Sequence, residues 1–117
     1  MTNARLSMLV LKTHQVAAVV AFYETIGLSF TEEQHGSGPL HFAGQANDVL
    51  IEIYPLPEDK PVDTTTRLGF AVDNIAEVLN ALLQRELSPP KTAKQTEWGL
   101  RAVVKDPDGR AVELYQK

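Results

Sequence analysis

Apolar side chains follow two spacings along the chain, and these predict two helices set among short strands. Residues 16–26 carry apolar side chains at i, i+3, i+4 and i+7, which predicts an amphipathic helix. Gly27 follows directly and suits a helix C-cap. Residues 75–82 repeat the same spacing behind Asp73 or Asn74, either of which makes a good N-cap. The two predicted helices lie in opposite halves of the chain.

Short runs rich in apolar and β-branched residues predict strands where Gly, Pro or polar residues separate them. These runs cover 6–11, 28–33, 40–43, 49–55, 67–72, about 91–94, 98–105 and 110–115. The last two form a hairpin, because Pro107 and Gly109 between them fit a type I turn. Each half of the chain therefore has the order β-α-β-β-β.

The two halves also match in register. The segment Ile51-Glu52-Ile53-Tyr54 corresponds to Val112-Glu113-Leu114-Tyr115 position by position, and the first helix aligns with the second from Val16 on Ile75. Such self-similarity indicates an internal duplication. We expect a single domain over residues 1–117, with modules at about 5–56 and 65–117 joined by a proline-rich linker at about 57–64.

Strand parity predicts which side chains lie on each face. The aliphatic positions of the first strand of each module are expected to pack under the helices. The opposite faces hold Met8, Arg67, Glu52 and Glu113, which form two pairs of equivalent positions. Small residues beside Arg67 leave room for a cavity there.

Composition narrows the possible functions. The 117 residues suit one domain, and a net charge of −4 without a Lys/Arg cluster argues against nucleic acid as a partner. The absence of cysteine excludes disulfides and thiolate chemistry. The longest apolar run, residues 16–22, is too short to cross a membrane, and no signal peptide is visible. We therefore expect a cytoplasmic protein.

Several phrases, taken in order, resemble the vicinal oxygen chelate superfamily, which includes glyoxalase I, bleomycin-resistance proteins, methylmalonyl-CoA epimerase and extradiol dioxygenases. The phrases are residues 21–28, residues 70–74, Trp98-Gly99, Asp106-Pro107-Asp108-Gly109 and Glu113-Leu114. The resemblance runs from about Leu6 to Tyr115. It implies an α+β fold in which two tandem βαβββ modules form a curved, partly open, barrel-like mixed sheet around a cleft, with the helices outside. It also implies a homodimer.

In metal-dependent members of that superfamily, two His or Gln and two Glu side chains hold a divalent ion. The matching positions here are Met8, Glu52, Arg67 and Glu113. Both glutamates are present, but the imidazole or amide positions are lost. A guanidinium cannot ligate a cation, so we expect no metal and no other cofactor at these positions.

The three histidines do not replace the missing ligands in this interpretation. His14 falls at a junction between strand and helix, and His35 lies in a glycine-rich loop. His41 is on a strand that can neighbour the Glu52 strand, so it alone is kept as a cleft residue. For all three we expect surface or structural roles rather than metal ligation.

Three roles remain open for the charged positions. In the first, Arg67 bridges Glu52 and Glu113 and holds the modules together, so that Arg67→Ala costs roughly 3 kcal/mol if the cluster is buried. In the second, the charges line a ligand-binding cleft with Tyr54, Tyr115 and Trp98 as aromatic walls. In the third, Glu52 or Glu113 is a catalytic general base and Arg67 supplies the positive charge of the missing metal.

The sequence-based hypothesis is a metal-free small-molecule-binding protein similar to the bleomycin-resistance branch. The alternative is a metal-dependent glyoxalase-like lyase, epimerase or dioxygenase with a rearranged ligand set. A third class, a protein-interaction module, would have its cleft filled by its own side chains. The expected ligand-binding residues are Met8, Glu52, Arg67, Glu113, Tyr54, Trp98 and His41.

Overall fold

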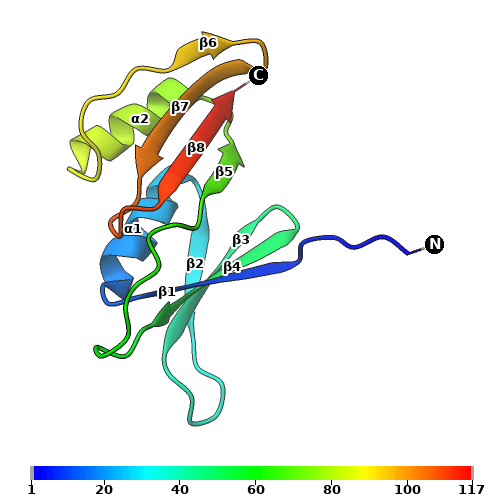
Figure 1. Cartoon of the computed structure of the whole chain (residues 1–117), viewed down its shortest axis with the longest axis vertical. Coiled ribbons are helices and arrows are strands. Elements are labelled where there is room, and N and C mark those ends of the chain that lie inside the picture. Colours follow the sequence, from blue (N-terminus) through cyan, green and yellow to red (C-terminus); the bar gives the residue numbers. More distant parts are fainter. Residues whose placement is uncertain (1, 117) are drawn as a thin grey trace.

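The computed structural model describes residues 2–116 and contains the two predicted modules (Figure 1). Each has the order βαβββ, so the α+β class and the tandem repeat are confirmed. The elements are β1 Met8–Thr13, α1 Val16–Ile26, β2 Ser29–Glu33, β3 His41–Ala46, β4 Val49–Pro55, β5 Leu68–Ala71, α2 Ile75–Gln84, β6 Lys94–Thr96, β7 Gly99–Lys105 and β8 Ala111–Gln116.

The strands form two separate four-stranded sheets with the same topology. The first sheet has the order β1-β4-β3-β2 and the second β5-β8-β7-β6. In each, the first strand pairs in parallel with the last strand of its module, and the other pairs are antiparallel. β1 and β5 are therefore edge strands. The two sheets do not join, so the barrel-like arrangement is not closed within residues 2–116.

Both helix boundaries follow from local chemistry. Gly27 ends α1 with φ of 134°, and its N–H donates to the carbonyls of Tyr23 and Glu24. Such a positive φ favours glycine because it has no Cβ. Asn74 begins α2, since its side chain accepts from the backbone N–H of Glu77 at 3.1 Å. The predicted helix starts and both predicted caps are confirmed.

Some strands begin or end elsewhere than predicted, because pairing decides their limits. β1 starts at Met8 rather than Leu6, where β4 first supplies a partner in Leu50. β6 covers Lys94–Thr96 rather than about 91–94, opposite the first residues of β7. A pattern of single residues does not carry this cross-strand information.

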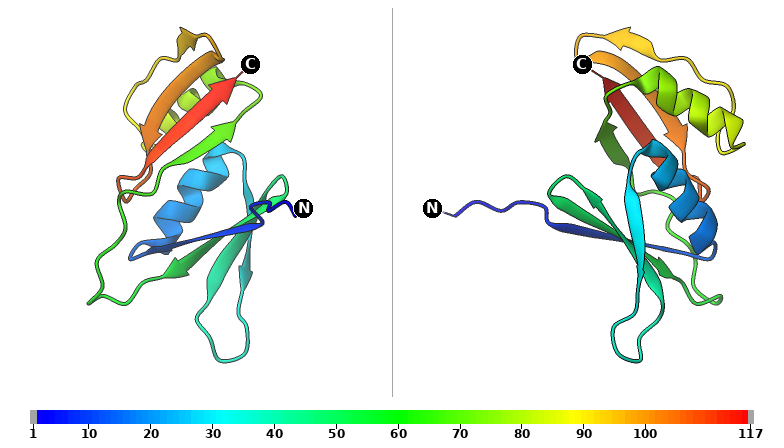
Figure 2. Two further views of the ribbon diagram at one scale, coloured as in Figure 1. Left: turned by 45° about the vertical axis from the view of Figure 1, so that its right-hand side comes forward. Right: turned by 180° about the vertical axis from the view of Figure 1, so that it is seen from behind.

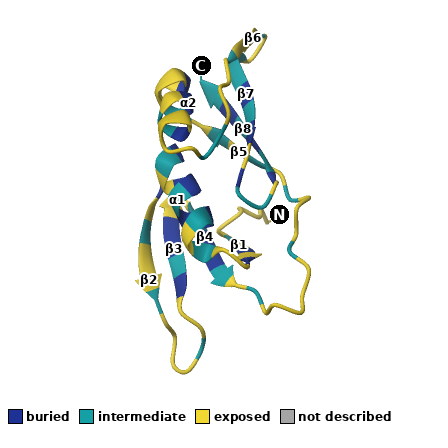
Figure 3. Ribbon diagram, turned by 90° about the vertical axis from the view of Figure 1, so that its left-hand side faces the viewer, coloured by how far each residue is buried: buried dark blue, intermediate teal, exposed yellow. Residues whose placement is uncertain are grey.

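The hydrophobic core lies between the helices and one face of each sheet. Leu11 and Ile51 contribute from the first sheet, Val112 and Leu114 from the second, and Tyr23 from α1, all nearly or fully buried. Figure 3 shows exposed residues along the linker and the β2–β3 loop and buried ones where helices meet strands. The predicted helix-facing sides of the strands are confirmed.

The molecule is more extended than its length requires. Its radius of gyration is 15.0 Å and its extents are 47 × 45 × 24 Å, whereas a compact chain of this length has a radius of gyration of about 13 Å. Figure 2 shows the two sheets diverging from the helices, so that neither covers the other. No helix within residues 2–116 is long and apolar enough to cross a membrane.

Candidate functional site

Glu113, in the middle of β8, lies at the centre of a hydrogen-bonded group that we call the Glu113 cluster. Its other members are Arg67, Arg101 and Tyr115. The Arg67 Nε donates to Glu113 Oε1 at 3.1 Å, and the Arg101 guanidinium forms a short ion pair with the same oxygen. The Tyr115 hydroxyl donates to Glu113 Oε2. Both carboxylate oxygens are therefore occupied.

The register of the second sheet assembles this cluster. Glu113 and Tyr115 are two residues apart on β8 and share its face. Arg101 on β7 is directly opposite Tyr115, and Gly69 on β5 is directly opposite Glu113. Arg67 is two residues before Gly69 and so reaches the carboxylate from the same face. A Cβ at Gly69 would meet only the Tyr115 ring, at 3.8 Å.

The cluster carries a positive charge at neutral pH. Hydrogen bonds from Tyr115, Arg67 and Arg101 lower the pKa of Glu113 to about 2, because each donor stabilises the carboxylate over the acid. Glu113 is thus ionised, and two guanidinium groups surround one carboxylate. The Arg67 side chain is 55% exposed and that of Arg101 is 34% exposed, so an anionic group can reach them from solvent.

Glu52 lies on the open face of the first sheet in different surroundings. Its Oε2 is 3.4 Å from His41 Nε2, and His41 Nε2 is 3.5 Å from Glu33 Oε1. Tyr54 stacks on His41 with ring centroids 4.1 Å apart and an angle of 7° between the planes. Burial and the charges of Glu52 and Glu33 raise the pKa of Tyr54. Opposite strand positions explain the grouping, since Glu33 and His41 are register partners.

The two predicted glutamates therefore belong to separate groups. Within residues 2–116, Arg67 has no hydrogen bond or ion pair to Glu52, so the expected bridge between the glutamates is not found in the chain. Arg67 is also half exposed rather than buried. Met8 lies on β1, 51% exposed, on the same side of the sheet as Glu52 by strand parity.

The metal that the resemblance implies does not fit the four matching positions. Arg67 and Arg101 already compensate the Glu113 charge, and Tyr115 occupies its second oxygen. Met8 offers only a weak thioether ligand. No described contact brings Glu52 to Glu113. We derive no chemistry from a metal at these positions.

Trp98 is 68% exposed in the turn between β6 and β7. Together with Tyr115 it lines a small hollow of about 370 Å³ next to Ala71 at the end of β5. A larger groove of about 710 Å³ runs between the modules and has Arg67 at its wall, with apolar residues such as Leu9 and Phe70. The side chains of residues 2–116 leave this groove open.

A second arginine, Arg110, forms a buried group that sequence reasoning missed. Arg110 is fully buried, and its NH1 is 3.1 Å from both Asp106 Oδ2 and Asp108 Oδ2. Its NH2 donates to the Lys12 carbonyl of β1 at 3.0 Å. The Tyr23 hydroxyl of α1 donates to Asp106 at 2.8 Å. We call Tyr23, Asp106, Asp108 and Arg110 the Arg110 cluster; it ties the β7–β8 turn to the first module.

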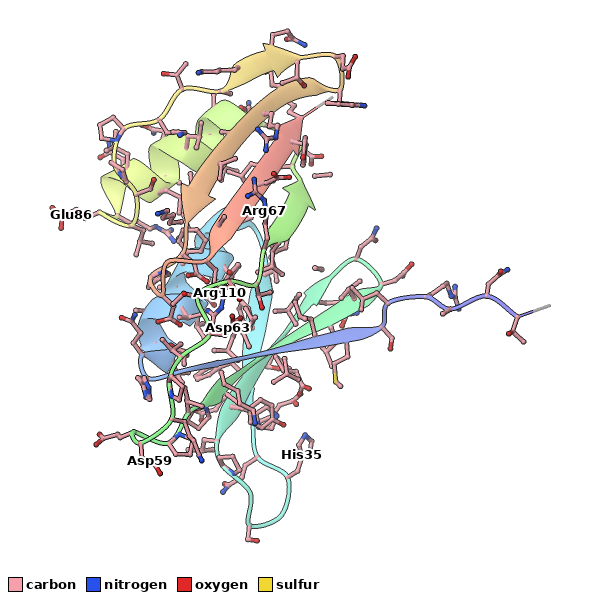
Figure 4. The ribbon with its side chains drawn as sticks, viewed as in Figure 1. His35, Asp59, Asp63, Arg67, Glu86 and Arg110 are labelled. Carbon is pink, nitrogen blue, oxygen red and sulfur yellow. The ribbon has the colours of Figure 1, made fainter. Side chains whose placement is uncertain are left out.

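Figure 4 shows the arginines in their two settings. Arg110 lies beside Asp63 at the base of the second sheet, and Arg67 lies higher, next to β5. His35 lies well apart from both, on the β2–β3 loop. A signal for Arg101 did exist in the sequence, because counting outward from the predicted turn places it opposite Tyr115. For Arg110 the signal was the surrounding acidic residues, Asp106 and Asp108.

The paired βαβββ modules with open, charged sheet faces define the vicinal oxygen chelate class of fold. The chain belongs to the Glyoxalase/Bleomycin resistance protein/Dioxygenase superfamily, whose family model matches residues 5–114. The sequence-based identification of this superfamily is thus confirmed. No curated protein matches the chain.

Solved structures with the same fold come from proteins of different kinds. The antibiotic-binding protein TnmS3 from a Streptomyces species is 21% identical, with 99% of this chain and 98% of that chain covered and a TM-score of 0.71. The bleomycin resistance determinant encoded on transposon Tn5 is 20% identical, with 97% and 98% covered and a TM-score of 0.66. Lactoylglutathione lyase from Agrobacterium tumefaciens is 16% identical, with 99% and 96% covered and a TM-score of 0.67. At these identities the similarity establishes the fold.

Proposed function

We propose that this protein is a homodimer that binds a small molecule. No metal is bound at Met8, Glu52, Arg67 and Glu113 in this proposal. The observation that carries the proposal is the Glu113 cluster. It holds a half-exposed Arg67 beside Arg101 with one carboxylate between them. A cluster with surplus positive charge and access to solvent suits an anionic group on a ligand.

The first sheet offers the complementary chemistry. Glu52 and Glu33 supply negative charge, and Tyr54 supplies an aromatic surface. A ligand that carries both an anionic group and a cationic or aromatic group would use both faces. Binding by such a fold has precedent in the antibiotic-binding and bleomycin-resistance proteins of similar structure. Bleomycin itself is a probe here and not an assigned ligand.

The open shape of the chain supports the proposed homodimer. The two sheets of one chain do not join, and β1 and β5 are edge strands that each pair on one side only. Met8 is 51% exposed and Val10 is 36% exposed on β1, which leaves an apolar surface next to Glu52. We propose that the first sheet of one copy faces the second sheet of the other. Each cleft would then join Glu52 of one chain to Arg67 of its partner.

The alternative enzymatic functions have less support. A glyoxalase-like lyase, an epimerase or a dioxygenase requires a metal at the matching positions, and the ion pairs of Glu113 oppose one. A protein-interaction module was expected to have a cleft filled by its own side chains, whereas the Glu113 cluster keeps the Arg67 side chain 55% exposed.

The test is binding by calorimetry and thermal stabilisation, with bleomycin and a panel of cationic aromatic carboxylates as probes. A compound that binds wild type should bind Arg67→Ala at least about tenfold more weakly, because a charge-assisted hydrogen bond is lost. Arg85→Ala is the matched control, since Arg85 donates to Thr25 beside the helices and far from either open face. Equal binding by Arg67→Ala would refute the role of the Glu113 cluster.

Mixing two defective variants tests whether a cleft is shared. Glu52→Gln and Arg67→Ala are each expected to bind poorly alone. A mixed dimer would contain one cleft with both substitutions and one with neither, so that binding returns at one site per mixed dimer. If unfolding and refolding the mixture restores no binding, the shared cleft is wrong.

A further inference from the structure

Two histidines and a glutamate gather at the β2–β3 hairpin, apart from the Glu113 cluster. Glu33 ends β2, His35 lies in the following loop, and His41 begins β3. One ligand atom from each lies within 4.8 Å of the others. We call these three residues the hairpin triad. Glu52 on β4 adjoins the triad through His41.

His41 is held with one nitrogen aimed into the triad. Its Nδ1 is 3.2 Å from the Pro39 carbonyl, and a carbonyl only accepts, so Nδ1 carries the proton. Nε2 is then the ring atom that faces the triad and can act as a ligand. His41 is 1% exposed, and Nε2 has no hydrogen-bond partner among residues 2–116. Fixing one ring nitrogen with a backbone carbonyl is the arrangement that metal-binding histidines use.

Nε2 of His41 faces two carboxylates. It lies 3.5 Å from Glu33 Oε1 and 3.4 Å from Glu52 Oε2. A nitrogen ligand and two carboxylates that converge on one point favour a cation between them. No lysine or arginine within residues 2–116 forms an ion pair with Glu33 or Glu52. In this part of the chain the two carboxylates have only histidines as ion-pair partners.

The distances fit the spacing of ligand atoms around a metal ion. A protonated imidazole donating to a carboxylate does so at about 2.7–2.9 Å, which is shorter than the separations here. Donor atoms around a tetrahedral ion with bonds of about 2.0–2.1 Å are about 3.3–3.4 Å apart. The His41–Glu33 and His41–Glu52 separations match that value, and His35 Nε2 is likewise 3.5 Å from Glu33 Oε1.

We propose that Glu33, His35 and His41 bind a divalent zinc ion, with Glu52 next to the fourth coordination position. Two imidazoles and a carboxylate are a typical zinc ligand set, whereas Mg²⁺ and Ca²⁺ prefer oxygen ligands alone. This set differs from Met8, Glu52, Arg67 and Glu113, and it would give His35 and His41 a ligand role in place of the expected surface or structural ones. The ion would lie on the same open face as Tyr54, at the wall of the proposed cleft.

The experiment uses full-length protein with its affinity tag removed and bound metal stripped by a chelator. Zinc is titrated at neutral pH in competition with a chromophoric chelator. Wild type is expected to bind one zinc per chain. His35→Gln should weaken zinc binding by more than about tenfold, and it should fold normally because the His35 side chain is 73% exposed. Glu33→Gln should weaken binding in the same direction.

Two controls locate the ion. His14→Gln removes the remaining histidine, which contacts the Lys60 carbonyl away from the triad, and should leave zinc affinity unchanged. Glu113→Gln should also leave it unchanged, whereas an ion at the four family positions would be lost. Absence of stoichiometric zinc, or wild-type affinity in His35→Gln, would overturn the proposal. Loss of zinc in Glu113→Gln would overturn it too.

Discussion

Two arginines, Arg110 and Arg67, each pair with carboxylates of the second module, but their surroundings differ. Arg110 is fully buried, forms ion pairs with three aspartates and donates to a backbone carbonyl of the first module. Arg67 is 55% exposed and contacts one glutamate, which it shares with Arg101. The guanidinium group of Arg110 thus has no access to solvent, whereas that of Arg67 is accessible.

This difference separates a structural cluster from a candidate site. The cost of burying a charge is met in the Arg110 cluster by partners on nearly every side, and these partners come from both modules. That cluster therefore fixes how the modules meet. The Glu113 cluster joins residues of a single sheet and retains exposed donors, so its geometry is better explained by a ligand than by stability.

The largest expected effect is on Arg110. Replacing it in Arg110→Met leaves Asp106 buried without its cationic partner, and we expect a loss of about 3–5 kcal/mol in the free energy of unfolding. Urea denaturation measures this directly. Lys105→Met, at the exposed end of β7, is the matched control and should change stability by no more than about 0.5 kcal/mol. A loss below about 1 kcal/mol in Arg110→Met would contradict the structural role.

If Arg110→Met does not fold, Tyr23→Phe tests the same cluster with a smaller structural change. It removes only the hydroxyl that donates to Asp106, and a hydrogen bond to a charged group contributes about 1.5–3 kcal/mol. Stability equal to wild type in Tyr23→Phe would show that the cluster does not hold the modules together.

Two glycines give a smaller contrast between the regions. Gly109, in the turn beside Arg110, has φ of 89°, so Gly109→Ala should cost about 1–2 kcal/mol of stability. Gly69, next to the Glu113 cluster, is not among the positive-φ glycines, and an added Cβ would meet the Tyr115 ring at an ordinary 3.8 Å. Gly69→Ala should be nearly neutral in thermal denaturation; a cost equal to that of Gly109→Ala would count against this comparison.

Arg67→Ala should change stability by less than about 1 kcal/mol, because exposed ion pairs contribute little. This replaces the roughly 3 kcal/mol expected for a buried cluster. Denaturation of Arg67→Ala beside Arg110→Met gives the comparison in one experiment. A loss of 3 kcal/mol or so would instead favour a structural Arg67.

The smallest expected effect is on the pKa of Glu113. The donors around Glu113 lower its pKa to about 2, so the folded state binds its proton less readily than the unfolded state. The stability contributed by this group is present above its ordinary pKa of about 4.5 and is lost as pH falls through about 2. Carboxyl NMR of Glu113 should give the low pKa in wild type and a higher one in the double variant Arg67→Ala, Arg101→Ala. An unchanged pKa in that variant would contradict the assigned cause.

Much of the fold was predictable because local patterns determine it. Helix α1 was predicted at Val16–Ile26 from apolar spacing and Gly27, and β4 at Val49–Pro55 from an uninterrupted β-prone run. The hairpin turn was predicted from Pro107 and Gly109. In each case the signal lies within a few consecutive residues, where backbone preference and side-chain periodicity agree.

The partners of the site residues were less predictable, because they depend on contacts between distant segments. Parity placed Glu52 and Glu113 on the open faces, but it could not show that the two sheets diverge within the chain. For that reason the bridge by Arg67 from Glu113 to Glu52 is not found among residues 2–116 of one chain. The partner found instead, Arg101, follows from hairpin register, and the His41 environment depends on how the 34–40 loop folds back.

We propose that each open sheet face is completed by a second copy of the chain. The most direct test is the mass of the untagged protein by size-exclusion chromatography with light scattering at micromolar concentration. The account predicts twice the chain mass of 12.9 kDa. A single chain's mass that persists as the concentration is raised would contradict the shared cleft.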